Sequence, residues 1–272
     1  GGAGTIWKVE EQLGPHTGWV KDISCQTISA CCEDKETYIF SIGCNCIEVW
    51  SLGSGKYQHQ HKLQIESSVE MGSTLSSDLL CLATYSECDA VTNEGAGAKY
   101  LLAGGVDGRI HRWTIQNNKF SNAGVISAHN GRLNAMAVCI GMNVLVSVGN
   151  DGCVICSQMN DCDPSRWDKT SLDVIGGDGI ASKIASLCIL HDELNGAIIA
   201  VGTSCGQISL VKILQADDNS LKVSLLGGRN SVGLEDGERG AVHALCGKRY
   251  SIFCRIIIGH SVGLSVWDIS LQ

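Results

Sequence analysis

One segment has the residue types and spacing of a serine nucleophile. Gly259, Ser261 and Gly263 match the pattern G-x-S-x-G, which in hydrolases places the serine on a sharp turn between a strand and a helix. Such an enzyme also needs an acid and then a histidine later in the chain. The nine residues after Gly263 include Asp268 but no histidine, and residues 264–267 have the apolar pattern of a strand. We therefore interpret the segment as a glycine turn, and we do not expect an enzyme.

Pairs of cysteine and histidine are the second candidate, because these side chains bind zinc. A structural zinc needs four converging ligands. Cys153 and Cys156 are three residues apart on an expected strand, so they should face opposite sides. His59 and His61 are two apart and should share one face of a polar strand, where solvation accounts for them. No segment has the glycine and lysine spacing of a phosphate-binding loop, and we expect neither a metal nor another cofactor.

The charge of the chain restricts its partners. The net charge is −8 and the isoelectric point about 5.4. An acidic chain repels phosphate, so direct binding to nucleic acid is not expected. No apolar run approaches the ~18 residues that a transmembrane helix needs, so insertion into a membrane is not expected either.

The cysteines indicate a reducing environment. The chain has 15, an odd number, and many stand in apolar runs such as 80–82, 138–140 and 187–189. Free cysteine behaves as a small buried apolar residue, and disulfides are rare inside cells. We expect unbridged thiols and an intracellular location, with the cytoplasm first and the nucleus or an organelle matrix as alternatives.

Short apolar segments recur five times and must position any functional residue. Each repeat begins with a strand that has two apolar residues three apart, as in Val20 and Ile23 or Leu133 and Met136. A second segment is rich in β-branched residues and ends in glycine, which is typical of a buried central strand. Its copies are 38–43, 100–105, 144–149, 197–202 and 255–259. A third segment follows a polar turn, at 47–50, 110–113, 154–157, 208–211 and 264–267.

A fourth, more polar strand follows four of these third segments, for example at 57–65 and 220–226. Five units of about four short strands, without a helical period, predict an all-β chain folded as a β-propeller. The approximate units of this single domain are 16–65, 66–128, 129–178, 179–232 and 233–272. The segment 5–13 is expected to supply the missing outer strand of the last unit, which would remove an exposed edge. Alternatively, the segment is the remnant of a preceding unit that is absent from this chain.

The repeated segments resemble the WD40-repeat family. Asp107 and Asp151, each followed by glycine, are similar to the aspartate turn of that family, and Trp267 with Asp268 matches the dipeptide that names it. The resemblance covers nearly the whole chain. By contrast, Trp167 follows a turn-like sequence and is expected in a loop before a fourth strand. Seven units are common in the family, so a true number of five, six or seven stays open.

The resemblance implies that each unit joins a histidine, a serine or threonine, an aspartate and a tryptophan by hydrogen bonds. The matching positions are His16, Ser41 and Trp50 in the first unit, Asp107 and Trp113 in the second, His129, Ser147 and Asp151 in the third, and Trp267 in the fifth. No unit keeps all four residues. In the first unit Asn45 is expected in place of the aspartate, so the chain is a divergent member.

The resemblance places the residue before each first strand on one rim of the propeller. These residues are Trp19, Asp78, Arg132, Lys183 and Ala241. Tryptophan and arginine often anchor protein interfaces, so the first expectation is a scaffold that binds partner proteins or peptides on this rim. One alternative is a small-ligand or catalytic site in the central channel, although the first strands carry mostly Ala, Ser, Leu and Cys. Another is a structural subunit of a large assembly.

Overall fold

Strands make up most of the computed structural model. It describes residues 13–14, 16, 18–29, 35–43, 45–53, 56–65, 78–86, 99–116, 118–161, 163–174, 183–226, 230–231, 240–250, 253–261 and 263–270. These residues form twenty strands and one short 3-10 helix, and no α-helix lies among them. The described residues therefore offer no helix that could cross a membrane.

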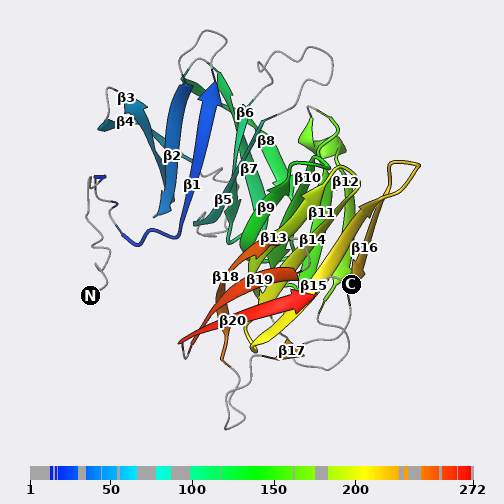
Figure 1. Cartoon of the computed structure of the whole chain (residues 1–272). Helices are drawn as coiled ribbons and strands as arrows, with labels where there is room; N and C mark the ends of the chain where they lie inside the picture. The colour runs from blue at the N-terminus through cyan, green and yellow to red at the C-terminus, as the bar shows by residue number, and fades with distance from the viewer. Residues whose placement is uncertain are drawn as a thin grey trace, which may run out of the picture.

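The strands form five sheets in which, apart from the two-residue β17 (Asn230–Ser231), each strand pairs antiparallel with the next strand of its sheet along the chain (Figure 1). The first sheet contains β1 (Asp22–Ser29), β2 (Lys35–Gly43), β3 (Cys46–Gly53) and β4 (Lys56–Gln64). The second contains β5 (Leu79–Ser86), β6 (Lys99–Gly105), β7 (Arg109–Gln116) and β8 (Lys119–Ser127). The third contains β9 (Leu133–Cys139), β10 (Val144–Gly149), β11 (Cys153–Gln158) and β12 (Asp168–Asp173), with the 3-10 helix η1 (Pro164–Arg166) before β12.

The last two sheets do not have four strands. The fourth contains β13 (Ile184–Glu193), β14 (Gly196–Thr203), β15 (Gln207–Gln215) and β16 (Leu221–Leu225), and the two-residue β17 (Asn230–Ser231) also pairs with β15. The fifth has three described strands, β18 (Val242–Arg249), β19 (Phe253–His260) and β20 (Gly263–Ser270). Residues 5–12, which were expected to add its outer strand, lie outside the described residues.

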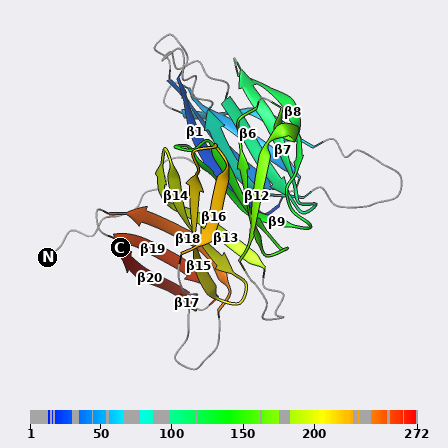
Figure 2. The same cartoon turned by 90° about the vertical axis from the view of Figure 1, so that its right-hand side faces the viewer.

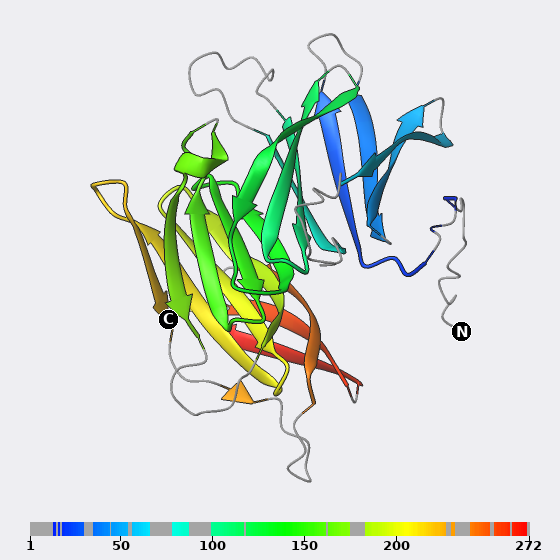
Figure 3. The same ribbon diagram turned by 180° about the vertical axis from the view of Figure 1, so that it is seen from behind.

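The five sheets follow one another in an arc, in chain order (Figures 1, 2 and 3). Their first strands are neighbours, so that β1 contacts β5, β5 contacts β9, β9 contacts β13 and β13 contacts β18. Four apolar cores fill the spaces between consecutive sheets. Within the described parts of the chain, the first and last sheets make no comparable contact with each other. The prediction of an all-β chain with five sheets is thus confirmed, but the structure does not show a closed ring.

The two middle strands β10 and β19 show how position in the arc sets burial. Every residue of β10 is buried, because the third sheet has a neighbour on both faces. In β19, Cys254, Ile256 and Ile258 are buried but Arg255 and Ile257 are exposed. The strand was predicted to be a buried central strand, and this is correct for only one of its faces.

Candidate functional site

The residues expected on the rim occupy equivalent positions at the start of successive sheets. The backbone carbonyl of Asp78 accepts a hydrogen bond from the amide of Val106 at 2.9 Å. The carbonyls of Arg132 and Lys183 accept equivalent bonds from Asn150 and Ser204, each at 2.8 Å, and that of Ala241 accepts one from Ser261 at 3.1 Å. These bonds join the residue before the first strand to the turn between the second and third strands, so the positions lie on one edge of the array.

Trp19 belongs to the same series. A Cβ atom built on Gly43 would lie 2.7 Å from the Trp19 carbonyl oxygen, and one on Gly149 would lie 2.9 Å from that of Arg132. The Trp19 side chain is 82% exposed, and the Lys21 ammonium lies 5.9 Å from the centre of its ring. We call Trp19, Asp78, Arg132 and Lys183, whose side chains are all exposed, the edge residues.

The third sheet contains a hydrogen-bonded histidine behind this edge. His129 Nε2 lies 3.0 Å from Ser147 Oγ, and His129 Nδ1 lies 2.9 Å from an Asp151 carboxylate oxygen. Asp151 also accepts hydrogen bonds from the amides of Asn130 and Cys153, at 2.9 and 3.2 Å. Burial on its own raises the pKa of Asp151, but these hydrogen bonds outweigh it and hold the pKa below the usual 3.8. The network ties the turn to the strand and places Arg132 on the edge.

The first sheet keeps only half of this network. His16 Nε2 is hydrogen-bonded to Ser41 Oγ, while the buried His16 Nδ1 has no hydrogen-bond partner among the described residues. The turn is shorter than in the third sheet: four residues separate the paired Ile42 and Ile47, whereas five separate Val148 and Val154. Asn45, at φ 64°, therefore corresponds to Gly152, at φ 76°. The expectation that Asn45 takes the place of the aspartate was wrong, because the turn has lost one residue.

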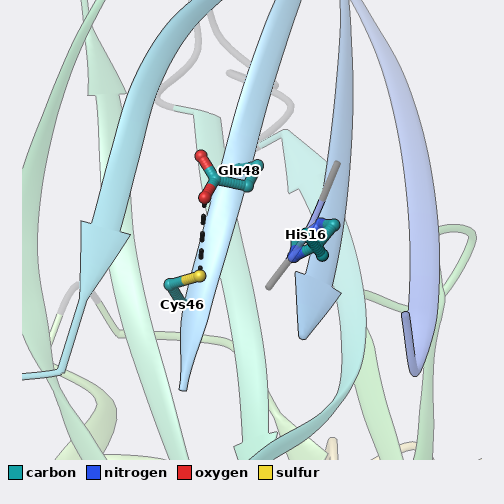
Figure 4. Close-up of side chains that lie close together, drawn as sticks. All are labelled: His16, Cys46 and Glu48. Carbon is teal, nitrogen blue, oxygen red and sulfur yellow. Dashed lines mark hydrogen bonds between the residues drawn. The ribbon is translucent and has the colours of Figure 1, made fainter. Parts of the chain in front are cut away.

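His16, Cys46 and Glu48 form the one group of candidate metal ligands among the described residues (Figure 4). One ligand atom from each lies within 4.8 Å of the others. The Cys46 thiol donates to the Gly43 carbonyl at 3.2 Å and lies 3.6 Å from a Glu48 oxygen. Cys46 and Glu48 stand two apart on β3 and so share a face. This i, i+2 spacing of a cysteine and a glutamate is visible in the sequence, but the expected ligand pairs combined only cysteines and histidines.

The surroundings of Glu48 do not favour a cation. Its carboxylate accepts from His59 Nε2 at 2.7 Å and from the Lys62 ammonium at 3.4 Å. Burial raises the pKa of Glu48, but the bonds from His59 and Lys62 outweigh it and keep the pKa below the usual 4.5. Zinc usually takes four ligands, and the described residues bring together three. Because Lys62 already neutralises the carboxylate, we interpret the group as a hydrogen-bonded network.

His59 and His61 do not share a face, in contrast to the expectation. The pairing of β3 with β4 shifts between Val49 and Trp50, where Val49 pairs with His61 and Trp50 with His59. The resulting β-bulge turns the two histidines to opposite sides. His59 reaches Glu48, whereas His61 Nε2 lies 2.9 Å from the Asn118 carbonyl oxygen of the next sheet.

The tryptophans differ in burial. Trp50 and Trp113 are buried, whereas Trp267 is partly buried because the last sheet has one neighbour. Trp167 follows η1 as the expected loop residue, yet it is buried and its indole donates to the Asp161 carbonyl at 2.8 Å. It covers Arg112, a buried cation whose guanidinium lies 3.8 Å from the centre of the Tyr100 ring. Arg112 was not predicted as a buried residue because arginine is mostly exposed in proteins, although the equivalent residues Val49 and Cys156 are buried as well.

The G-x-S-x-G segment forms the turn between β19 and β20. Ser261 Oγ lies 3.1 Å from His243 Nε2, and both residues are exposed. A strand rather than a helix follows the turn, so the context that the hydrolase pattern requires is not met. Among the described residues no carboxylate is hydrogen-bonded to His243.

No protein-family model matches the sequence, and a comparison with curated proteins finds no relative.

Proposed function

We propose that this protein is a WD40-type β-propeller that acts as an interaction scaffold and binds partner proteins through its edge residues. The observation that carries the proposal is that Trp19, Asp78, Arg132 and Lys183 stand at one repeated position and are all exposed. A partner that crosses several sheets would meet all of them along one edge.

The chemistry of the edge residues suits a protein partner. The exposed ring of Trp19 offers a large apolar surface with few rotatable bonds. Arg132 can form a bidentate pair with a carboxylate or stack on an aromatic ring. With Lys183 also on this edge and Asp78 the one acidic member, the set favours a partner segment that presents both acidic and apolar side chains. An intracellular location, with the cytoplasm first, belongs to the same proposal.

Partner retention by a double variant tests the proposal. The wild type and the Trp19→Ala/Arg132→Ala variant are each immobilised on a resin and incubated with an extract of the native source. The proteins that each resin retains are quantified by mass spectrometry. We expect a specific partner to bind the variant more weakly by about 1–4 kcal/mol, as for interface hot spots. The matched control is Leu194→Ala/Lys222→Ala, since Leu194 is 76% exposed and Lys222 is exposed away from the edge.

Equal retention by the edge variant and the control, with unchanged melting curves, would refute the proposal. A partner lost with the control instead would move the binding surface to another side of the molecule.

A further inference from the structure

Two apolar residues at the start of each first strand hold consecutive sheets together. We call them the insertion pair; the pairs in the second to fifth sheets are Leu79 and Leu82, Leu133 and Met136, Ile184 and Leu187, and Val242 and Leu245. Each of these pairs packs in the core between its own sheet and the preceding one. The leading residues Leu79, Leu133, Ile184 and Val242 are fully buried. Insertion of this pair is therefore the common feature of all four interfaces between sheets.

In two of the four interfaces the preceding sheet receives the insertion pair in a recess at a glycine of its middle strand; the equivalent positions in the first and third sheets are Ile42 and Val148. A Cβ atom on Gly104 of β6 would lie 2.5 Å from Leu133 Cδ2. A Cβ atom on Gly202 of β14 would lie 2.4 Å from Val242 Cγ1. Both distances are far shorter than a van der Waals contact, so glycine leaves the space that the inserted side chain fills.

The last sheet has the same recess without an inserted side chain. Gly259 of β19 corresponds to Gly202, because each follows the same shift in pairing with the first strand. The nearest atom to a Cβ on Gly259 would be Ala244 Cβ of its own sheet, at 3.5 Å. We call the face of each sheet that looks toward the next sheet the forward face. On the last sheet Gly259 stands on this face with no neighbour from another sheet among the described residues.

Apolar side chains surround the open recess. Leu264, which pairs with Gly259, is 77% exposed, although its counterparts Ile110, Val154 and Ile208 are buried. Ile257 and Val266 pair with each other and are also exposed on this face. The counterparts of Ile257 are Leu102, Val146 and Ala200, and all three are fully buried. The last sheet thus keeps the residue types of a covered forward face.

Two cationic side chains, Arg255 and Lys248, pair in register at the end of this face away from Gly259. The Arg255 guanidinium donates to both oxygens of Asp268, at 2.7 and 2.8 Å. Covering the apolar side chains next to Arg255 would therefore not leave its charge without a partner.

The opposite end of the arc carries the complementary feature. Val20 and Ile23 form the insertion pair of the first sheet, since Trp19 stands in the position of Arg132 and Val20 in that of Leu133. Val20 is 47% exposed and Ile23 is also exposed. Of the five insertion pairs, this is the one that no preceding sheet receives among the described residues.

We propose that the first sheet of one copy of this chain docks on the last sheet of a second copy. Val20 and Ile23 then fill the recess at Gly259 and cover Leu264, as Leu133 and Val242 fill the recesses at Gly104 and Gly202 within one chain. The two ends stand apart in the arc (Figures 1 and 3), so the contact forms between molecules and requires that the ring of the proposed propeller stay open within one chain. Because the two surfaces differ, the association is head-to-tail and continues beyond a dimer unless the assembly closes into a ring. It uses sheet faces, so it goes beyond the scaffold function proposed for the edge residues.

The mass of the protein in solution tests the proposal. Sedimentation velocity over a wide range of concentration should show the wild-type mass rising from one chain to dimers and larger species. Val20→Glu and Leu264→Glu should each abolish this rise, since either places a charge in the apolar interface. Leu194→Glu is the matched control, because Leu194 is as exposed as Leu264 but lies in the turn between β13 and β14. Equal melting temperatures of the three variants establish that the fold is intact.

Mixing the two end variants gives the sharper result. The Val20→Glu chain keeps an intact last sheet and the Leu264→Glu chain an intact first sheet. Their mixture should therefore form dimers and nothing larger, although neither variant associates alone. A wild type that stays monomeric at every concentration would overturn the proposal. So would self-association of Val20→Glu with loss only in Leu264→Glu, which would mean that two last sheets pair with each other.

Discussion

Gly202 and Gly259 occupy equivalent positions in adjacent sheets, yet an added methyl group should affect them differently. Neither glycine has the left-handed φ that disfavours other residues, so alanine fits the backbone at both positions. The difference lies in the space. At Gly202 the new Cβ would lie 2.4 Å from Val242 Cγ1 and 2.7 Å from Ser186 Oγ. At Gly259 the nearest atom would be 3.5 Å away.

The space around each glycine sets the expected change in the free energy of unfolding. Val242 is fully buried between the fourth and fifth sheets, so it cannot move without separating them. Overpacking of this kind costs about 1–3 kcal/mol, which we expect for Gly202→Ala. Gly259→Ala meets only ordinary van der Waals contact. Because alanine restricts the unfolded chain more than glycine does, we expect this variant to be unchanged or more stable by about 0.4–1 kcal/mol.

Urea unfolding of the two variants beside the wild type measures the difference. The protein is kept dilute, so that association does not add to the free energy of unfolding. The change in melting temperature offers a second measure, at about 2–4 °C for each kcal/mol in a chain of this size. Equal destabilisation by both variants would refute the assignment of Gly259 to an empty recess. No loss at Gly202 would refute the insertion of Val242.

Three further outcomes test other parts of the structure. Trp113→Ala should cost about 3–5 kcal/mol because the ring is buried between two sheets, and an unchanged melting temperature would show that the repeat is misaligned. Asp151→Asn should destabilise the protein at neutral pH, and the difference in free energy of unfolding from the wild type should become smaller as the pH falls below 3.8. The lowered pKa of Asp151 gives the wild type a stabilisation that is lost when the folded carboxylate takes up a proton. A difference in free energy of unfolding that is the same at every pH would contradict this role of Asp151. Thiol titration in denaturant should find all 15 cysteines free, and elemental analysis should find no stoichiometric zinc; a thiol deficit or one zinc per chain would refute both expectations. In the native protein, among the ten cysteines that the structure describes, Cys25 and Cys246 should react first because they are exposed, while burial raises the pKa of the Cys156 and Cys188 thiols to about 12.

Local patterns in the sequence were sufficient to place the strands. The apolar segment 144–149 coincides with β10, and the third segment 110–113 lies inside β7. The spacing of Val20 and Ile23, repeated at Leu133 and Met136, also marked the residues that join the sheets. These features depend on alternation and on residue type, both of which are local properties of a chain.

Features that depend on pairing between strands escaped prediction. The β-bulge beside Trp50 reverses His59 relative to His61, and nothing in the alternating sequence of β4 reveals it. That the first turn is one residue shorter than the third emerges only when the pairing of Ile42 with Ile47 is known.

Ten of the cysteines lie in the described residues, and none of these ten forms a disulfide.

Ile257 shows most clearly what residue type alone does and does not establish. Its segment has the composition of a strand buried on both faces, like that of Val146, yet the structure buries only one face of β19. Each Å² of apolar surface removed from water contributes about 25 cal/mol, so leaving Ile257, Leu264 and Val266 uncovered forgoes stabilisation that every other sheet obtains. The same holds for Val20 at the other end of the arc. Because one end offers a recess at Gly259 and the other an insertion pair, contact between two chains would cover both surfaces at once. The four interfaces within the chain therefore serve as a template for a fifth between chains.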